Sequence, residues 1–251
     1  MTLTRTAAAL LASALLMAAS SAHAAAISRA DEAAIRKNLA QRLPDLPKID
    51  EVSKTPMPGL WEVRIGTDLL YSDAEGTYVI EGGSLIDSRN RLNLTQQRVA
   101  KLTAIRFEDL PLKDAMVIKQ GNGSRKLAVF GDPNCGYCKR LERDLQALKD
   151  VTIYTFVYPV LGADSDVRSR AIWCTKDAMA SWRRWMIDGV APLRAMGECD
   201  TGAIERNVAF GRKHRINGTP ALVFEDGVRV PGAMSAADLE KRLVEARRPK
   251  G

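Results

Sequence analysis

Two cysteines three positions apart, Cys135 and Cys138, limit what this chain can fold into. The apolar run before them, residues 126–130, predicts a strand, and the residues after them predict a helix. Cys138 shares one face of that helix with three apolar residues: Leu141, Leu145 and Leu148. Cys135 is therefore expected at the start of the helix, and Cys138 on its buried face.

This placement predicts two unlike thiols. The free amides and the positive dipole end at a helix start favour a thiolate, which is the reactive form of cysteine. One helical turn brings the two sulfurs within bridging distance. The pattern therefore predicts Cys135 as the exposed attacking thiol and Cys138 as the shielded thiol that resolves mixed disulfides.

Two other interpretations of the cysteine pair are open at this point. A CxxC pair can be half of a zinc site, but the remaining ligands would have to come from Cys174, Cys199 or His214. Neither of those cysteines has a ligand partner close in sequence. A purely structural Cys135–Cys138 bridge would close a very short loop and remove little chain entropy. We therefore expect neither a metal nor another cofactor.

Residues 1–24 have the pattern of an export signal. Arg5 supplies a positive charge, an apolar run broken only by Ser13 follows, and Ala22-His23-Ala24 fits the small-x-small cleavage pattern. A membrane-spanning helix is the alternative, but a span needs about 20 apolar residues and this run is shorter. Export from the cytosol permits disulfides, so the 4 cysteines of the chain could form two pairs.

Composition places the chain among soluble globular proteins. It has 251 residues, of which 46% are hydrophobic and 27% charged, enough for one large or two modest domains. The net charge of +7 raises the question of nucleic-acid binding. Because acidic and basic residues are interspersed and the Lys/Arg clusters are short, we expect no nucleic-acid partner.

The segment 27–88 predicts a small α+β domain. Residues 28–43 have helical apolar spacing, and glycines then separate short segments in which apolar and polar residues alternate. About 60 residues bury little surface alone. Such a domain either pairs with a second copy through its edge strands or packs on its neighbour, and the sequence does not distinguish the two. Residues 95–107 predict a connecting helix.

The remaining segments alternate between strands and helices. Two apolar runs, 115–119 and 126–130, flank Gly121-Asn122-Gly123 and predict a β-hairpin. After the helix that carries Cys138, we expect a further strand, a helical segment, a strand that follows Thr219-Pro220, its hairpin partner and a final capped helix. Their ranges are 151–158, 164–212, 221–224, 228–230 and 235–247.

In this order, residues 107–251 resemble a thioredoxin-fold domain. The motif that contains Cys135-Gly-Tyr-Cys138, followed by Ala171-Ile-Trp-Cys174 and Gly218-Thr-Pro220, closely resembles the DsbC/DsbG family of bacterial periplasmic thiol:disulfide interchange proteins. Residues 25–88 also resemble that family's N-terminal dimerisation domain. The implied fold class is an α+β dimerisation domain joined by a linker helix, residues 89–106, to a thioredoxin-fold α/β domain with a helical insertion at about 164–212.

The resemblance also implies a mechanism and partners. The protein would be a periplasmic homodimer in which Cys135 attacks incorrect disulfides of exported proteins and Cys138 resolves trapped mixed disulfides. Pro220 would be a cis-proline beside Cys135, with Thr219 shaping the redox site. Cys174 and Cys199 match the family's structural disulfide, and an inner-membrane reductant of the DsbD type would keep Cys135 and Cys138 reduced.

Two alternatives to an isomerase stay open. One is a DsbG-like periplasmic reductase and chaperone, which would share the fold and the cysteine chemistry. Gly136-Tyr137 between the cysteines favours the DsbC-like interpretation. The other is a chaperone without thiol chemistry, which the CxxC motif at a helix start argues against.

The sequence departs from the family pattern at two positions. Lys139 stands where the family commonly has His, and Val129 stands where thioredoxin has a buried Asp. Glu142 could supply a proton acceptor instead, but its helical position predicts a solvated side chain. His214 is predicted to pack in a loop or on the surface, and Trp173, Trp182 and Trp185 to belong to the core.

Overall fold

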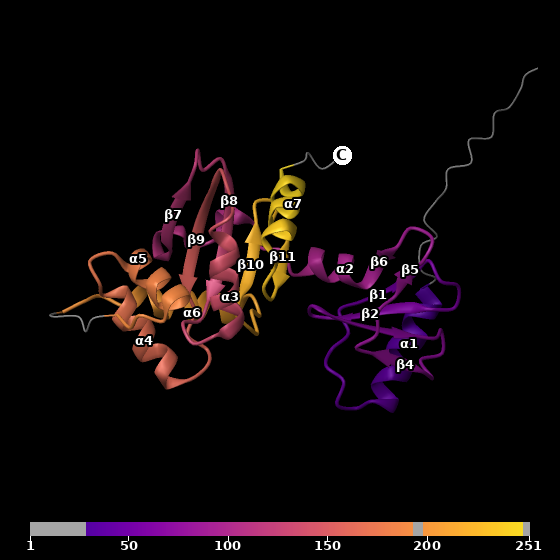
Figure 1. The fold of residues 1–251 in the computed structure, drawn as a ribbon. Coiled ribbons are helices and arrows are strands. Elements are labelled where there is room, and N and C mark those ends of the chain that lie inside the picture. The colour runs from indigo at the N-terminus through magenta and orange to yellow at the C-terminus, as the bar shows by residue number, and fades with distance from the viewer. Residues whose placement is uncertain (1–28, 193–197, 248–251) are drawn as a thin grey trace, which may run out of the picture. The chain divides into compact units, whose positions relative to one another are not determined.

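The computed structural model describes residues 29–192 and 198–247 (Figure 1). The chain divides into two compact units. The first runs up to Gly66 and includes Leu70–Glu81, and the second comprises Thr67–Leu69 and the chain from Gly82 onward. The predicted export signal, residues 1–24, lies outside the described residues. Within the described ranges, no helix has both the length and the apolar character to cross a bilayer.

The smaller unit is a helix packed on a four-stranded sheet. Helix α1 (Arg29–Arg42) is followed by β1 (Glu51–Lys54), β2 (Trp61–Ile65), β3 (Asp68–Ser72) and β4 (Val79–Glu81), in that spatial order. Ile35 and Leu39 of α1 pack against Val52, Trp61 and Val63 of the sheet. The alternating segments of the sequence therefore form the expected sheet, and β1 is an additional strand that the sequence analysis missed.

The predicted connecting helix is shorter than expected. A two-stranded ribbon, β5 (Ile86–Asp87) and β6 (Leu92–Asn93), leads into α2 (Leu94–Leu102). The helix ends at Thr103, whose backbone amide and hydroxyl both donate to the carbonyl of Val99. The Ile105 amide then donates to the Gly227 carbonyl at 2.9 Å, a partner that it could not reach as part of a continuing helix.

The larger unit is built on a five-stranded mixed sheet. Its spatial order is β11-β10-β8-β9-β7. The central strands β8 (Arg125–Gly131) and β9 (Val151–Val157) are parallel to each other. The outer strands β7 (Met116–Gln120) and β10 (Ala221–Phe224) pair antiparallel with β9 and β8, and β11 (Arg229–Pro231) pairs antiparallel with β10.

The predicted hairpin of residues 115–119 and 126–130 is wrong, because β9 lies between β7 and β8. The turn between them binds Asp150, the residue that precedes β9. The Asn122 amide donates to the Asp150 carboxylate at 2.9 Å, and the Arg125 amide donates to its carbonyl at 3.0 Å. A Cβ at Gly121 would lie 2.4 Å from the Asp150 carboxylate, so the glycine admits the start of β9.

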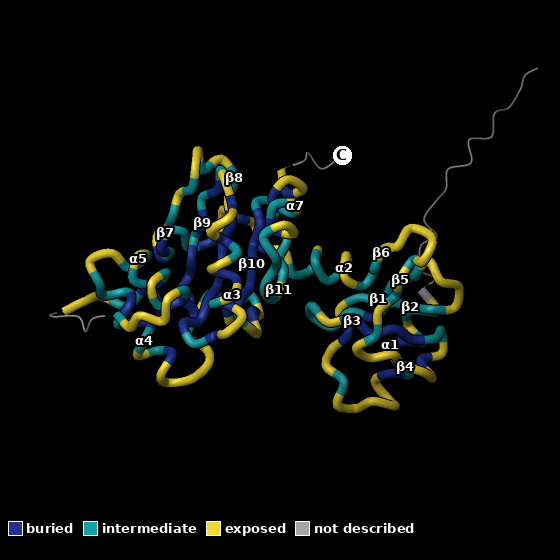
Figure 2. The backbone as a smooth tube through the Cα atoms, in the orientation of Figure 1, coloured by how far each residue is buried: buried dark blue, intermediate teal, exposed yellow. Residues whose placement is uncertain are grey.

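Helices cover both faces of this sheet. Leu127 and Val129 of β8 face α3 (Gly136–Leu145) and α7 (Ala236–Ala246). The alternate residues Ala128 and Phe130 point to the other face, which is covered by α6 (Gly202–Lys213) and by the chain around Phe107. Figure 2 shows the central strands buried along most of their length. A strand enclosed on both faces fixes the position of the loop that follows it.

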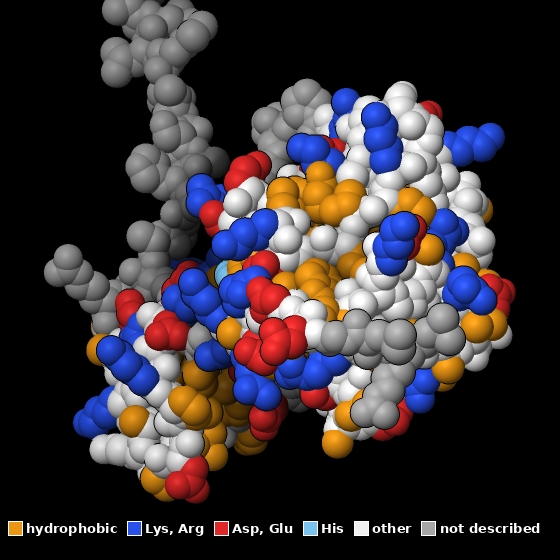
Figure 3. All heavy atoms as spheres, turned by 90° about the vertical axis from the view of Figure 1, so that its left-hand side faces the viewer, with side chains coloured by type: hydrophobic (Ala, Val, Ile, Leu, Met, Phe, Trp, Pro, Cys, Tyr) orange, Lys and Arg blue, Asp and Glu red, His pale blue; other side chains and the backbone are white. Residues whose placement is uncertain are grey.

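The insertion between β9 and β10 consists of α4 (Ala163–Trp173), α5 (Ala178–Arg183), η3 (Arg184–Asp188) and α6. Charged side chains of both signs are interspersed on the face shown in Figure 3. Within the insertion, Arg170 forms ion pairs with two acidic side chains: it lies 2.9 Å from Asp166 and 3.2 Å from Glu205.

Candidate active site

The junction between β8 and α3 places the two sulfurs in different surroundings. Strand β8 ends at Gly131, and α3 begins at Gly136 with Cys135 as its N-cap residue. The Cys138 amide donates to Cys135 Sγ at 3.3 Å, so a sulfur takes the place of the usual capping oxygen. Cys138 lies on the apolar face of the helix and is 3% exposed.

Asp132 holds the loop that leads to Cys135. Its carboxylate is fully buried and accepts two hydrogen bonds at 2.8 Å, from the Asn134 amide and the Ser165 hydroxyl. It also accepts from the amides of Val160 and Leu161 at 2.8 and 3.0 Å. The sequence analysis gave Asp132 no role, although an Asp two residues before a turn amide is a common capping arrangement.

The Thr219–Pro220 segment lies against Cys135. The peptide bond between these two residues is cis, and the Thr219 carbonyl oxygen is 3.2 Å from Cys135 Sγ. The structure thus brings together four of the predicted site residues, Cys135, Cys138, Thr219 and Pro220. It also corrects the prediction of an exposed Cys135, which is only 6% exposed because this segment, distant in sequence, covers it.

The surroundings shift the pKa values of the two thiols in opposite directions. Hydrogen bonds from the Cys138 thiol, from the Thr219 side chain and from the amides of Cys138 and Tyr137 outweigh burial and lower the pKa of Cys135 to about 5. The hydrogen bond to Cys135 and then burial raise the pKa of Cys138 well above its ordinary value. The pair therefore combines a stable thiolate with a thiol that holds its proton.

The expectation of a solvated Glu142 is wrong. The side chain lies one turn after Cys138 on α3, and the residue is 7% exposed. Trp182 Nε1 donates to its carboxylate at 3.1 Å, and Arg183 Nε lies 3.5 Å from the other carboxylate oxygen. The sequence could not show this burial, because the residues that cover Glu142 come from the insertion.

The insertion also contacts both sides of the cysteine motif through Trp185. Its indole nitrogen donates to the Pro133 carbonyl at 2.7 Å, just before Cys135. The Lys139 ammonium lies 4.4 Å from the ring centroid, and the Arg168 guanidinium lies 3.9 Å from it. Cation–π contacts of this kind hold the Lys139 charge on the indole face. Trp182 is fully buried as predicted, whereas Trp185 is partly buried.

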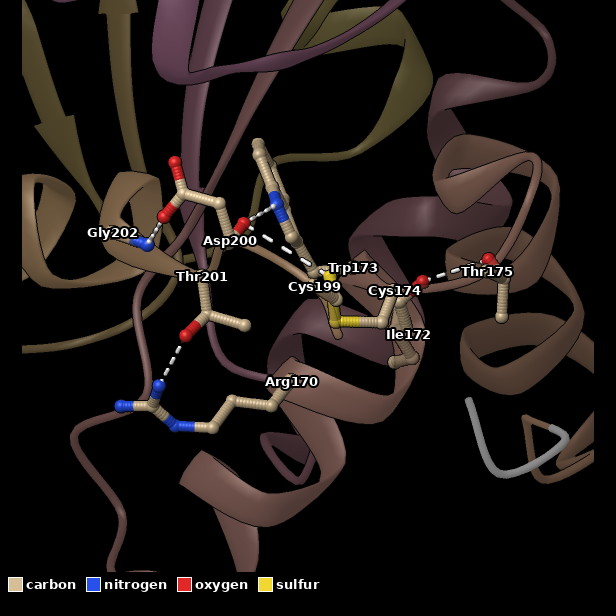
Figure 4. Close-up of a disulfide and its surroundings, with 9 residues drawn as sticks. All are labelled: Arg170, Ile172, Trp173, Cys174, Thr175, Cys199, Asp200, Thr201 and Gly202. Carbon is tan, nitrogen blue, oxygen red and sulfur yellow. Dashed lines mark hydrogen bonds between the residues drawn. A yellow bond between two sulfur atoms is a disulfide. The ribbon is translucent and has the colours of Figure 1, made fainter. Parts of the chain in front are cut away.

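Cys174 and Cys199 form a disulfide within the insertion, with a Cα–Cα distance of 5.8 Å (Figure 4). It joins the end of α4 to the segment before α6. Trp173 Nε1 donates to the Asp200 carbonyl at 3.1 Å, beside the bridge. His214 lies at the end of α6, with its ring centroid 4.3 Å from that of Phe210. In the described part of the chain, no three His, Cys, Asp or Glu side chains are grouped to hold a metal ion.

Comparisons with known proteins agree with this geometry. A family profile described as "Thioredoxin-like domain" matches residues 112–247, and one described as "Disulfide bond isomerase protein N-terminal domain" matches residues 26–96. The probable thiol:disulfide interchange protein DsbC of Bordetella pertussis is 45% identical over 210 residues, which cover 84% of this chain and 73% of that protein. The chain belongs to the DsbC family.

Two more distant relatives support the assignment. The thiol:disulfide interchange protein DsbC of Escherichia coli K12 is 30% identical over 226 residues, covering 87% of this chain and 89% of that protein. The crystal structure of a disulfide interchange protein from Neisseria gonorrhoeae covers 55% of this chain and 99% of its own, with 33% identity and a TM-score of 0.52. Membership of the DsbC family confirms the predicted fold class and the predicted enzyme class, a thiol–disulfide oxidoreductase.

The unlike thiols of this DsbC-family protein predict a characteristic alkylation profile. Since the pKa of Cys135 is lowered to about 5, its thiolate is lost only as the pH falls through that value. In the reduced protein, the rate of Cys135 alkylation by iodoacetamide should be half-maximal near pH 5 and constant around pH 7, while Cys138 stays unlabelled. Peptide mass spectrometry measures both rates. Cys138→Ala should move the Cys135 midpoint to higher pH, and equal labelling of the two cysteines in the unaltered protein would contradict the assignment.

The Cys174–Cys199 bridge predicts a separable effect on stability. It closes a loop of 25 residues, which corresponds to about 3.5 kcal/mol in the loop-entropy estimate. The double variant Cys174→Ser, Cys199→Ser should lose about that free energy of unfolding and keep the alkylation profile of Cys135. Denaturant unfolding with and without a reductant measures this. The reductant should lower the free energy of unfolding of the unaltered protein and leave that of the double variant unchanged. Equal free energies of unfolding for the two proteins without reductant would show that the bridge does not stabilise the fold.

Proposed function

We propose that this chain is a periplasmic disulfide isomerase that rearranges incorrect disulfides of exported proteins through Cys135 and Cys138. The observation that carries the proposal is the pairing of a thiolate at a helix N-cap with a buried thiol one turn later. The neighbouring Thr219–Pro220 segment supports it, because backbone groups beside the thiolate can pair with an extended client segment.

The reaction begins with the Cys135 thiolate. It attacks one sulfur of a client disulfide, forms a mixed disulfide and releases the other client sulfur as a thiolate. That thiolate attacks a second client disulfide, and a later attack by a client thiolate on the mixed disulfide releases Cys135. The client gains a new pairing with no net oxidation, and the enzyme returns to its dithiol form.

Cys138 acts when the mixed disulfide does not resolve in this way. It loses its proton and attacks Cys135 Sγ, which forms a Cys135–Cys138 disulfide and leaves the client with two reduced sulfurs. The enzyme is then oxidised by two electrons. A dithiol reductant of the DsbD type in the inner membrane would restore the reduced pair.

The N-terminal unit is proposed to join two copies of the chain. Residues 25–88 contain no group with the chemistry of the cysteine site, and β4 is an edge strand of its sheet. Ile80 on that strand is 49% exposed, and Tyr78, just before the strand, is 76% exposed. An edge strand with exposed apolar side chains favours pairing with a second copy. Export through residues 1–24 agrees with the Cys174–Cys199 disulfide, since such bonds persist outside the cytosol.

The decisive experiment is the refolding of a client with scrambled disulfides. The reduced protein should restore client activity in substoichiometric amounts, and Cys135→Ser should give only the background rate. Cys138→Ser is the matched control, because it keeps the attacking thiol; it should accumulate a covalent complex with the client on non-reducing gels. Equal rescue by Cys135→Ser would refute the proposed reaction.

A truncated chain tests the role of the N-terminal unit. A fragment that begins at Ala104 retains Ile105, which is 1% exposed in the core of the larger unit. This fragment should be monomeric by sedimentation and should still exchange with small disulfides. Its rescue of scrambled clients should fall well below that of the full chain, because a second binding surface raises the effective concentration of the client. Full rescue by the monomeric fragment would remove any need for the dimer.

A further inference from the structure

Glu142 is a buried carboxyl group that the steps above do not use. It lies on α3 four residues after Cys138, and both residues belong to the buried face of that helix. Side chains four apart on a helix have Cβ atoms about 5–6 Å from each other. Burying a carboxylate is costly unless it is paired, so its position behind the resolving thiol needs an explanation.

The contacts of Glu142 come from α5. Trp182 Nε1 donates to one carboxylate oxygen at 3.1 Å, and Arg183 Nε lies 3.5 Å from the other. The nearby cations of α3 are engaged elsewhere: Lys139 lies over the Trp185 ring, and Arg143 donates to the Ile187 carbonyl at 3.3 Å. Among the described residues, Arg183 is therefore the charged group that Glu142 faces.

Trp182 connects this carboxylate to the Cys138 sulfur. A Cβ placed on Gly131 would lie 3.1 Å from the Trp182 ring and 4.0 Å from Cys138 Sγ. Ring and sulfur thus border the same point at the end of β8, and they belong to one apolar cluster. The nitrogen of the same indole donates to the Glu142 carboxylate.

The resolving step needs a proton acceptor at this place. Cys138 is 3% exposed and must become a thiolate before it can attack Cys135. Bulk water has little access to a thiol so buried. Its apolar neighbours are Met116, Val157, Ile172, Trp182, Met186 and Ile204, and its polar neighbours are Cys135, the Asp132 backbone and the Thr219 side chain.

We propose that Glu142 accepts the proton of the Cys138 thiol during the resolving step. The proton passes from Cys138 Sγ to the carboxylate. The Cys138 thiolate attacks Cys135 Sγ, the Cys135–Cys138 bond forms, and the bond to the client sulfur breaks, so that the client leaves as a thiolate. Trp182 positions the carboxylate and keeps its charge stabilised. The inference rests on the proposed function, because it concerns the same cysteine pair.

The pH dependence follows from the contacts of Glu142. Burial raises the pKa of this carboxyl group, while Trp182 and Arg183 act in the opposite direction. Only the ionised carboxylate accepts a proton, so the resolving rate should fall as the pH falls through that pKa. The groups that shift the pKa of the Cys138 thiol are Cys135, the Asp132 backbone and the Thr219 side chain. None of them is changed in the variants compared below.

A coloured aromatic disulfide, 5,5′-dithiobis(2-nitrobenzoate), separates the two steps in stopped flow. Attack by Cys135 releases a first nitrothiobenzoate, and attack by Cys138 on the resulting mixed disulfide releases a second. Glu142→Gln should leave the first phase unchanged and slow the second at pH 7 by about 100-fold, the lower range for general base catalysis. In this variant the rate of the second phase should rise about tenfold for each pH unit. It should not show the acid limb of the unaltered protein, which is the fall in rate as Glu142 becomes protonated.

Two further variants make the result specific. Glu205→Gln removes an exposed carboxylate on α6 and should leave both phases unchanged. Trp182→Phe keeps a ring and loses the donor, so it should move the acid limb of the second phase to higher pH; it also decides the question if Glu142→Gln does not fold. An unaltered second phase in Glu142→Gln, or an unmoved limb in Trp182→Phe, would overturn the inference. Loss of the first phase in the unaltered protein would instead refute the proposed function.

Discussion

The strand-to-helix junction at Gly131–Gly136 is the constraint on which the site depends. Because β8 is packed on both faces, the position of its C-terminal end is fixed, and this fixes where α3 begins. Cys135 then meets the free amides of the first turn, while Cys138 is carried onto the buried face. The buried Asp132 carboxylate joins the loop before Cys135 to the chain around Val160, because it accepts hydrogen bonds from both. The backbone path thus sets up the difference between the two thiols, because it brings the sulfurs together and buries Cys138.

Two tryptophans of the insertion pack against this junction. Trp185 holds the carbonyl before Cys135 and the ammonium after Cys138, and Trp182 packs where β8 ends. The insertion is tied down away from the site, since Arg206 of α6 forms a two-pronged ion pair with the buried Asp114, with distances of 2.9 and 2.7 Å. This ion pair, together with the Cys174–Cys199 disulfide just before α6, fixes the position of the insertion that carries Trp182 and Trp185.

Local sequence patterns predict those features of the structure that depend on residues close in sequence. The apolar spacing around Cys138 predicts its burial, and Ser235 begins the last helix as its capping pattern predicts. Errors arose where a distant segment intervenes. Strand β9 enters between the two strands of the predicted hairpin, and the Thr219–Pro220 segment covers Cys135. Neither event leaves a local signal, because pairing order and coverage are set by packing across the whole sheet.

Lys139 and Val129 are the two positions at which the sequence departs from the expected pattern. The Lys139 ammonium lies over the Trp185 ring and has N–H donors but no acceptor, so it can stabilise a nearby thiolate but offers Cys138 no acceptor atom. Val129, buried in the sheet, offers no acid either. In the proposed mechanism, the proton of Cys138 therefore goes to another group. The carboxylate that α3 buries one turn later, under an indole supplied by the insertion, occupies the place where such a group is needed.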